Sequence, residues 1–343
     1  MKQHLNTLFV TTDGAYLARE GHAVLVRHEK QTKLRLPIHT IGSIVCLGRV
    51  GVSPSLAGLC GEQGVSISLC TSHGRFLARI SGFTSGNVLL RREQYRKADD
   101  PTASAGITRA IVAGKIANCR QVLLRGARDH PESSGVTRLQ DAAEKLAQTL
   151  RMLSDDMDVD SLRGMEGDSG SAYFGVFNHL ITDPENGFAF TRRSRRPPLD
   201  NVNAMLSFIY AMLAHDVRSA CEGVGLDPAV GFLHRDRAGR PGLALDLMEE
   251  LRPFVADRLV LSLINRQQVD PAGFTTDQAG GVRMNDATRK ALLVAYQKRK
   301  QDMIEHPFLH EKVSIGLLPH LQARLLARHI RGDLDAYPPF MWK

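Results

Sequence analysis

The chain has 343 residues, enough for two domains or one large domain, and 43% of them are hydrophobic, which is enough for a buried core. A net charge of +8 and a pI near 9.4 favour a polyanionic partner, although a basic protein without such a partner fits the charge equally well. The five cysteines form no C-x-x-C pair, which argues against a paired-cysteine zinc site and a disulfide framework.

The N-terminal residues, Met-Lys-Gln-His-Leu-Asn, carry no apolar core of a signal peptide. No apolar run approaches the roughly 20 residues that a transmembrane helix needs. We therefore expect a cytoplasmic protein that is not attached to a membrane. Its cysteines should be buried and reduced.

Before residue 85, short β-prone runs alternate with turn signals. Ser53 as N-cap and Pro54 at the first helical position predict one short helix over residues 53–63. The pattern predicts a small β-rich domain over residues 1–84. The β-prone runs lie at residues 8–12, 23–27, 33–37, 43–47 and 65–69.

Residues 85–102 contain Gly86, Asn87 and the sequence Asp99-Asp100-Pro101, and this composition predicts a linker or hinge. Helical spacing of apolar residues then dominates, with a turn or kink expected at Pro253. We therefore predict an α+β protein in which residues 103–343 form a larger, all-α-helical catalytic domain. The predicted helices cover residues 107–124, 137–153, 161–180, 201–221, 243–266, 288–305 and 317–331.

Glu166 lies near the start of the predicted helix over residues 161–180 and shares a helical face with Tyr173. A carboxylate on a partly apolar face is costly unless it is paired or bound to a metal ion. The alternative is that Glu166 lies in the first helical turn and complements the helix dipole.

Two further segments carry candidate metal ligands. His234 ends an apolar run before a polar turn rich in Gly and Pro, and it is either a ligand or an ordinary surface histidine. Asp246, Glu249 and Glu250 can cluster on one helical face, where repulsion should raise at least one pKa unless a cation is bound. A solvated acidic face is the alternative, and Arg252 could neutralise part of it.

Four arginines, Arg192, Arg193, Arg195 and Arg196, lie within five residues of one another. Guanidinium groups bind phosphate oxygens well, although a solvated basic loop would have the same sequence. Carboxylate and imidazole ligands suit Mg²⁺ or Mn²⁺. Acids that hold a metal beside bases that hold phosphate indicate phosphodiester chemistry on nucleic acid.

Four segments together resemble a known family: RRPPLD at 195–200, NAMLSFIY at 203–210, GFLH at 231–234 and LDLMEELRP at 245–253. In order and spacing they are similar to the CRISPR-associated spacer-acquisition integrases, the "Cas-one" family, and most of all to subtype I-C. The resemblance covers the whole chain and implies a small β domain, a hinge and an α-helical catalytic domain.

The resemblance implies that Glu166, His234 and Glu249 bind Mg²⁺ or Mn²⁺, with Asp246 as a supporting acid. Asp246 stays open as an alternative third ligand. The implied reaction is attack by the 3′-hydroxyl of a short DNA, the prespacer, on a phosphodiester at the leader–repeat junction of a CRISPR array. The implied partners are DNA, a small ferredoxin-like subunit and a second copy of the chain that pairs through the β domain.

Two alternatives to integration remain open. A metal-dependent nuclease could use the same site with water as the nucleophile to cut branched or single-stranded DNA. A non-catalytic nucleic-acid scaffold could use the acids for structure alone. Loss of metal-dependent activity on replacement of Glu166 would exclude the scaffold.

Overall fold

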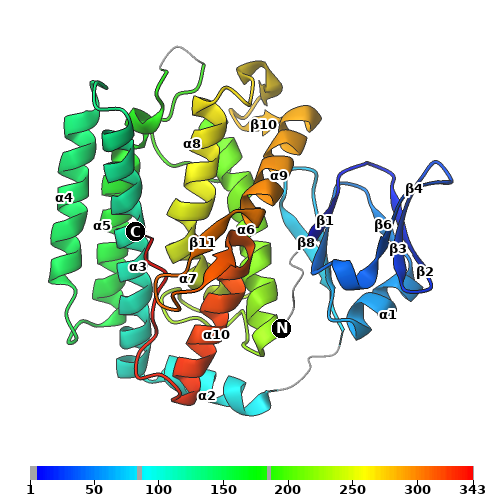
Figure 1. Cartoon of the computed structure of the whole chain (residues 1–343), viewed down its shortest axis with the longest axis horizontal. Helices are drawn as coiled ribbons and strands as arrows, with labels where there is room; N and C mark the ends of the chain where they lie inside the picture. The colour runs from blue at the N-terminus through cyan, green and yellow to red at the C-terminus, as the bar shows by residue number, and fades with distance from the viewer. Residues whose placement is uncertain (1–5, 83–86, 184–186, 343) are drawn as a thin grey trace. The chain divides into compact units, whose positions relative to one another are not determined.

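The computed structural model describes residues 6–82, 87–183 and 187–342 (Figure 1). The chain divides into two compact units, Met1–Gly86 and Asn87–Lys343. The first unit is rich in strands and the second in helices, which confirms the predicted α+β class.

The first unit contains two four-stranded sheets. In one sheet the order is β1-β5-β7-β8, and only β8 runs antiparallel to its neighbour. In the other the order is β4-β3-β2-β6. The strands are β1 (Thr7–Val10), β2 (Tyr16–Glu20), β3 (Ala23–His28), β4 (Gln31–Pro37), β5 (Ser43–Leu47), β6 (Gly51–Val52), β7 (Ser66–Cys70) and β8 (Phe76–Ile80).

The core of the first unit forms between its sheets and helix α1 (Pro54–Glu62). The Ser53 hydroxyl accepts a hydrogen bond from the Leu56 backbone N–H at 3.2 Å, so the predicted N-cap is confirmed. Leu59 is fully buried and packs in the same cluster as Leu17, which belongs to β2. The sequence analysis missed β2, β6 and β8, and charged residues such as those at the end of β2 dilute the strand pattern.

Most of the segment expected to be a linker, residues 85–102, is helical. Its start falls partly in residues 83–86, which lie outside the described residues. Helix α2 (Val88–Asp99) is fixed to the second unit by Gln94, which is fully buried. The Gln94 amide donates to the carbonyls of Asp227 and Val230, both at 2.8 Å.

The helices of the second unit are arranged around α3, which packs against α4, α5 and α7. Figure 1 shows α3, α4 and α5 side by side. Helix α6 packs against α7 and α10. The helices are α3 (Pro101–Asp129), α4 (Val136–Met152), α5 (Val159–Gly175), α6 (Asn201–Val224), α7 (Gly242–Leu251), α8 (Arg258–Asn265), α9 (Asp286–Gln301) and α10 (Leu318–Arg331).

The second unit also contains two short antiparallel strand pairs, so the expectation of an all-helical domain was wrong in this detail. Strand β9 (Phe274–Thr276) pairs with β10 (Val282–Met284), and β11 (Met303–Glu305) pairs with β12 (Lys312–Ser314). The helix expected to reach residue 305 therefore ends at Gln301, because the next residues belong to β11.

Two other helix ends differ from the sequence pattern. Helix α5 ends at Gly175, and a separate 3₁₀ turn, Phe177–Leu180, follows it. The expected irregularity at Pro253 is confirmed, since a π-helical turn, Arg252–Asp257, joins α7 to α8. Among the described residues, no helix is both long enough and apolar enough to cross a membrane.

Candidate metal centre

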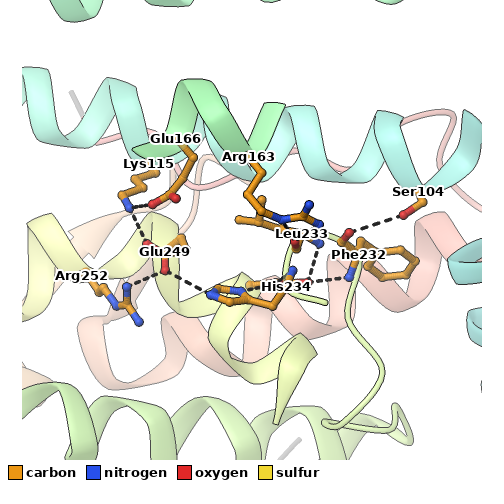
Figure 2. A network of polar contacts seen from close by, with 10 residues as sticks. Ser104, Lys115, Arg163, Glu166, Phe232, Leu233, His234, Glu249 and Arg252 are labelled. Atoms are coloured by element: carbon orange, nitrogen blue, oxygen red, sulfur yellow. Dashed lines mark hydrogen bonds and ion pairs between the residues drawn. The ribbon is translucent and has the colours of Figure 1, made fainter. Parts of the chain in front are cut away.

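Three elements bring Glu166, His234 and Glu249 together (Figure 2). Glu166 lies in α5, Glu249 in α7, and His234 in the segment between α6 and α7. Helix α5 begins at Val159, so Glu166 lies about two turns inside it. The acid in the first turn is Asp160, and the helix-dipole interpretation of Glu166 is therefore wrong.

A lysine from α3 joins the two glutamates. Lys115 Nζ forms ion pairs with Glu166 Oε1 and, at 2.8 Å, with Glu249 Oε2. Only 10% of the Lys115 side chain is exposed. Burial alone lowers the pKa of Lys115, but attraction by Glu249 and Glu166 outweighs burial and raises this pKa above its usual value. Lys115 is therefore a charged group that lies between two acids.

Glu249 is almost completely buried, with 2% of its side chain exposed. Its Oε1 lies 2.5 Å from Arg252 Nη1 and 4.0 Å from His234 Nε2. Burial raises the pKa of Glu249, but Arg252 and Lys115 lower it more strongly, to about 2. Glu249 is thus an ionised carboxylate at neutral pH, with one oxygen facing the imidazole.

Asp246 orients the imidazole. Its Oδ1 lies 2.6 Å from His234 Nδ1 and accepts the His234 backbone N–H at 3.0 Å. Its Oδ2 accepts the backbone N–H groups of Phe232 at 2.6 Å and Leu233 at 3.0 Å. When Nδ1 donates to Asp246, the lone pair of Nε2 remains free on the side that faces Glu249. This geometry favours Asp246 as the supporting acid.

Arg163 connects α5 to the segment that carries His234. Its Nε and Nη2 atoms donate to the Leu233 carbonyl at 2.9 and 2.7 Å. Arg163 lies one helical turn before Glu166, so this contact fixes the distance between the elements that carry Glu166 and His234 (Figure 2).

The donor set fits a hard divalent cation, because it combines carboxylate oxygens with an imidazole nitrogen. The 4.0 Å between Glu249 Oε1 and His234 Nε2 suits two ligands of one ion. Two atoms that each lie about 2.1 Å from a metal ion are at most about 4.2 Å apart. Among the described residues, however, no group of three or more His, Cys, Asp or Glu side chains is already arranged to hold a metal ion.

Asp246 and Glu249 both face His234, but Glu250 does not, so the expected cluster of all three acids on one helical face was wrong for Glu250. Glu250 faces the C-terminal segment, where its Oε1 accepts from the Tyr337 hydroxyl and its Oε2 accepts the Phe340 N–H at 2.7 Å. The expectation that one acid has a raised pKa is confirmed for Glu250, at about 7. Burial, rather than repulsion by Glu249, is the cause.

The arginine segment divides into exposed and anchored side chains. Arg192, Arg195 and Arg196 are exposed. Arg193 is half-buried: its guanidinium donates to Asn203 Oδ1 at 2.5 Å and lies 5.2 Å from the Tyr210 ring centroid. Three of the four predicted phosphate-binding arginines are therefore available to a ligand, while Arg193 holds the segment against α6.

Tyr173 belongs to the core and is 1% exposed. Its hydroxyl donates to Asp257 Oδ2 at 3.1 Å, and the Tyr210 hydroxyl donates to Asp257 Oδ1 at 2.6 Å. Tyr173 is therefore a buried core residue, and its hydroxyl is bonded to a carboxylate.

Neither Lys115 nor Arg163 was predicted from the sequence as a site residue. A signal for Lys115 was present, because it lies among helical positions that are apolar at Ile111, Val112 and Cys119. Lysine is rarely buried unless it is paired, so a lysine on such a face indicates an acidic partner. Arg163 gave no comparable signal, since its partner is a backbone carbonyl.

Comparison with known proteins shows which family the chain is similar to. The family model described as CRISPR associated protein Cas1 matches residues 8–298. "CRISPR-associated endonuclease Cas1 1" of Chlorobaculum tepidum is 52% identical over 343 residues, which is 100% of both chains. "CRISPR-associated endonuclease Cas1 2" of Rhodospirillum rubrum is 51% identical over 348 aligned positions, also with 100% of both chains covered.

Two solved structures share the fold. A Cas1 protein from Thermotoga maritima has a TM-score of 0.82 at 21% identity, with 97% of this chain and 99% of that chain covered. A casposase bound to its integration product has a TM-score of 0.81 at 20% identity, with 99% and 95% covered. The family model and the full-length relatives establish that the chain belongs to the CRISPR-associated Cas1 family.

Proposed function

We propose that this Cas1-family protein is a metal-dependent DNA integrase that joins the 3′-hydroxyl end of a short DNA to a phosphodiester of a CRISPR array. The convergence of Glu166, His234 and Glu249 from three separate elements carries the proposal. The ion pairs through Lys115 and the hydrogen bond between Asp246 and His234 preserve this convergence.

We propose that Glu166, His234 and Glu249 hold one Mg²⁺ or Mn²⁺ ion. Bound there, the ion would supply Lewis-acid polarisation of the phosphoryl oxygen and of the attacking and leaving oxygens. Asp246 keeps His234 in the tautomer that can ligate, and Arg163 keeps its segment in place. Among the residues at the site, no serine, cysteine or exposed tyrosine is paired with a base, which argues against a protein nucleophile, and in the proposed reaction the 3′-hydroxyl of DNA takes that role.

We propose that Arg192, Arg195 and Arg196 bind the DNA backbone without reading bases. Their exposure and the net charge of +8 support this role. A small ferredoxin-like subunit is the proposed partner, and the β-rich unit is the proposed homodimer interface. A structural neighbour from a "Cas6-RT-Cas1--Cas2 complex", at a TM-score of 0.83 and 21% identity, is consistent with a partner subunit.

The test is an integration assay with the full chain, the partner subunit, a supercoiled array plasmid and a labelled prespacer. Joined product should form with Mg²⁺ or Mn²⁺ and a free 3′-hydroxyl, and EDTA or a 3′-phosphate should abolish it. Glu166→Gln should form none. Asp168→Asn, which changes an exposed acid on the same helix, is the matched control and should retain activity. Product from Glu166→Gln, or from a blocked 3′ end, contradicts the proposal.

A second candidate is a metal-dependent endonuclease that uses water as the nucleophile at the same site. The names of the full-length relatives favour it. Branched DNA would then be cut without any joined product, and Glu166→Gln would abolish cutting. The integration assay separates the candidates, because joined strands are longer than the labelled prespacer and hydrolysed strands are shorter.

A further inference from the structure

We propose that Lys115 is a built-in counter-cation that occupies the space between Glu166 and Glu249 in the metal-free protein and must be displaced when the divalent ion binds. This inference rests on the proposed metal site. It adds a residue that determines how tightly that site holds its ion.

The contacts of Lys115 fit this role. Its ammonium touches one oxygen of each of the two glutamates, which come from different helices. Arg252 occupies the other oxygen of Glu249. A metal ion held by Glu166, His234 and Glu249 would therefore compete with these two cations for the carboxylates, and it would lie beside the Lys115 ammonium that now bridges them.

Charge balance points the same way. Glu166 and Glu249 supply two negative charges, and Lys115 with Arg252 supplies two positive charges. These four side chains are neutral together, Asp246 adds one negative charge beside His234, and a divalent ion would add two positive charges in a poorly solvated site. Moving the Lys115 ammonium away removes part of this excess and restores carboxylate oxygens as ligands.

The structure leaves room for that movement. A Cβ atom built at Gly170 of α5 meets only Lys115 Nζ, at 4.0 Å, and one built at Gly167 meets nothing within 4 Å. The side of α5 next to the ammonium therefore lacks a side chain at Gly170, and Gly167 borders open space. A lysine stem is long and flexible, so its head can move outward while the stem remains packed.

The wild-type protein tests the inference by amine acylation read by mass spectrometry, with and without saturating Mg²⁺. Lys115 should be protected without the metal ion and should react about fivefold faster or more with it, since release exposes the amine. Lys300 is the control, because it is equally buried and pairs with Asp216 at 2.8 Å. Unchanged Lys115 reactivity, in a protein whose unfolding temperature Mg²⁺ does raise, overturns the inference.

Variants give a second readout that does not need activity. Titration calorimetry with Mn²⁺ should show about tenfold tighter binding to Lys115→Met than to wild type, because the competing charge is gone. Lys300→Met should bind Mn²⁺ like wild type. The charge-preserving Lys115→Arg should bind Mn²⁺ like wild type or more weakly. Equal or weaker binding by Lys115→Met overturns the inference. Failure of the wild type itself to bind Mn²⁺ refutes the proposed metal site instead.

Discussion

Helix α7 places two adjacent glutamates in opposite environments. Glu249 faces α3 and is surrounded by the charged groups of Lys115 and Arg252, which lower its pKa to about 2. Glu250 faces the C-terminal segment and accepts hydrogen bonds from neutral donors, and burial raises its pKa to about 7. Burial beside cations thus favours the ionised form of Glu249, whereas burial among neutral groups favours the protonated form of Glu250.

The two environments indicate which side of α7 can do chemistry. Glu249 is kept ionised beside an imidazole, as a metal ligand must be. Glu250 ties α7 to Tyr337 and Phe340, and Asn118 of α3 donates to both the Glu250 and Phe340 carbonyls, at 2.7 and 2.8 Å. We infer that the contacts of Glu250 with the C-terminal segment hold α7 in place, and that they thereby fix the position of Glu249.

Replacing Glu249 should have the largest effect on activity. Glu249→Gln keeps the shape but loses the charged ligand, and we expect integration to fall by about 10³-fold or more. Glu250→Gln is the matched control one residue away and should keep activity within about tenfold, with lower stability. Initial rates at equal folded concentration measure this contrast. Similar losses of integration activity in both variants would show that the two sides of α7 do not differ in function.

Replacing Asp246 should have the next largest effect on activity. Asp246→Asn leaves the backbone N–H groups of residues 232–234 with a weaker acceptor and removes the charge that orients His234. Groups that orient metal ligands cost about 10- to 100-fold when changed, so the rate should fall by that much. Asp246→Ala should likewise remain more active than Glu249→Ala. The reverse order would make Asp246 the third ligand.

Asp257, in the π-helical turn that follows α7, is another buried acid, and it should make the stability of the protein depend on pH. Burial raises its pKa from 3.8 to about 6, against the hydrogen bonds from Tyr210 and Tyr173. The folded state therefore binds this proton more tightly, and the resulting stability is present below about pH 4 and is lost as pH rises through about 6.

Asp257→Asn cannot lose this proton. The unfolding free energy of wild type minus that of Asp257→Asn should therefore decrease by about 2 kcal/mol between about pH 4 and pH 7. Urea unfolding at both pH values measures it. A difference that stays constant or grows with pH would show that the buried carboxyl is ionised in the folded protein.

The arginine segment also contains side chains in different environments, some exposed and one anchored. Replacing them should have a smaller effect on function than the changes above. Replacing Arg195 and Arg196 by alanine should reduce the slope of log affinity against log salt by about one for each arginine–phosphate ion pair removed, equally for unrelated DNA sequences. Arg193→Ala should mainly destabilise the protein, because Arg193 bonds to Asn203. An unchanged salt slope in the double variant would assign the exposed arginines to a solvated loop.

Sequence patterns were sufficient for the division into a β-rich part and a helical part, whereas the ligand set came from the family resemblance and stays a prediction. The cap at Ser53 and the break at Pro253 follow from local chemistry, and both are present. The helix over 88–99 was missed because Gln94, which anchors it, is polar and contacts residues more than 130 positions away. Strand pairs such as β11 with β12 are too short for a periodic signal.

The arrangement of the site depends on partners that no local pattern contains. Helical spacing places Asp246, Glu249 and Glu250 near one another, but their roles follow from what faces each of them. Lys115 is more than 130 residues from Glu249, and Tyr337 is 87 from Glu250. The assignment to subtype I-C and the choice of metal ion stay predictions.

Anomalous diffraction from crystals of the full chain soaked in Mn²⁺ would show where the metal ion binds. We expect one strong anomalous peak within ligand distance of Glu166, His234 and Glu249, and no peak beside Glu250. The peak should vanish in Glu249→Gln crystals and persist in Glu250→Gln crystals. Absence of a peak among Glu166, His234 and Glu249 at saturating Mn²⁺, or a peak bound to Asp246 in place of Glu249, would contradict the account.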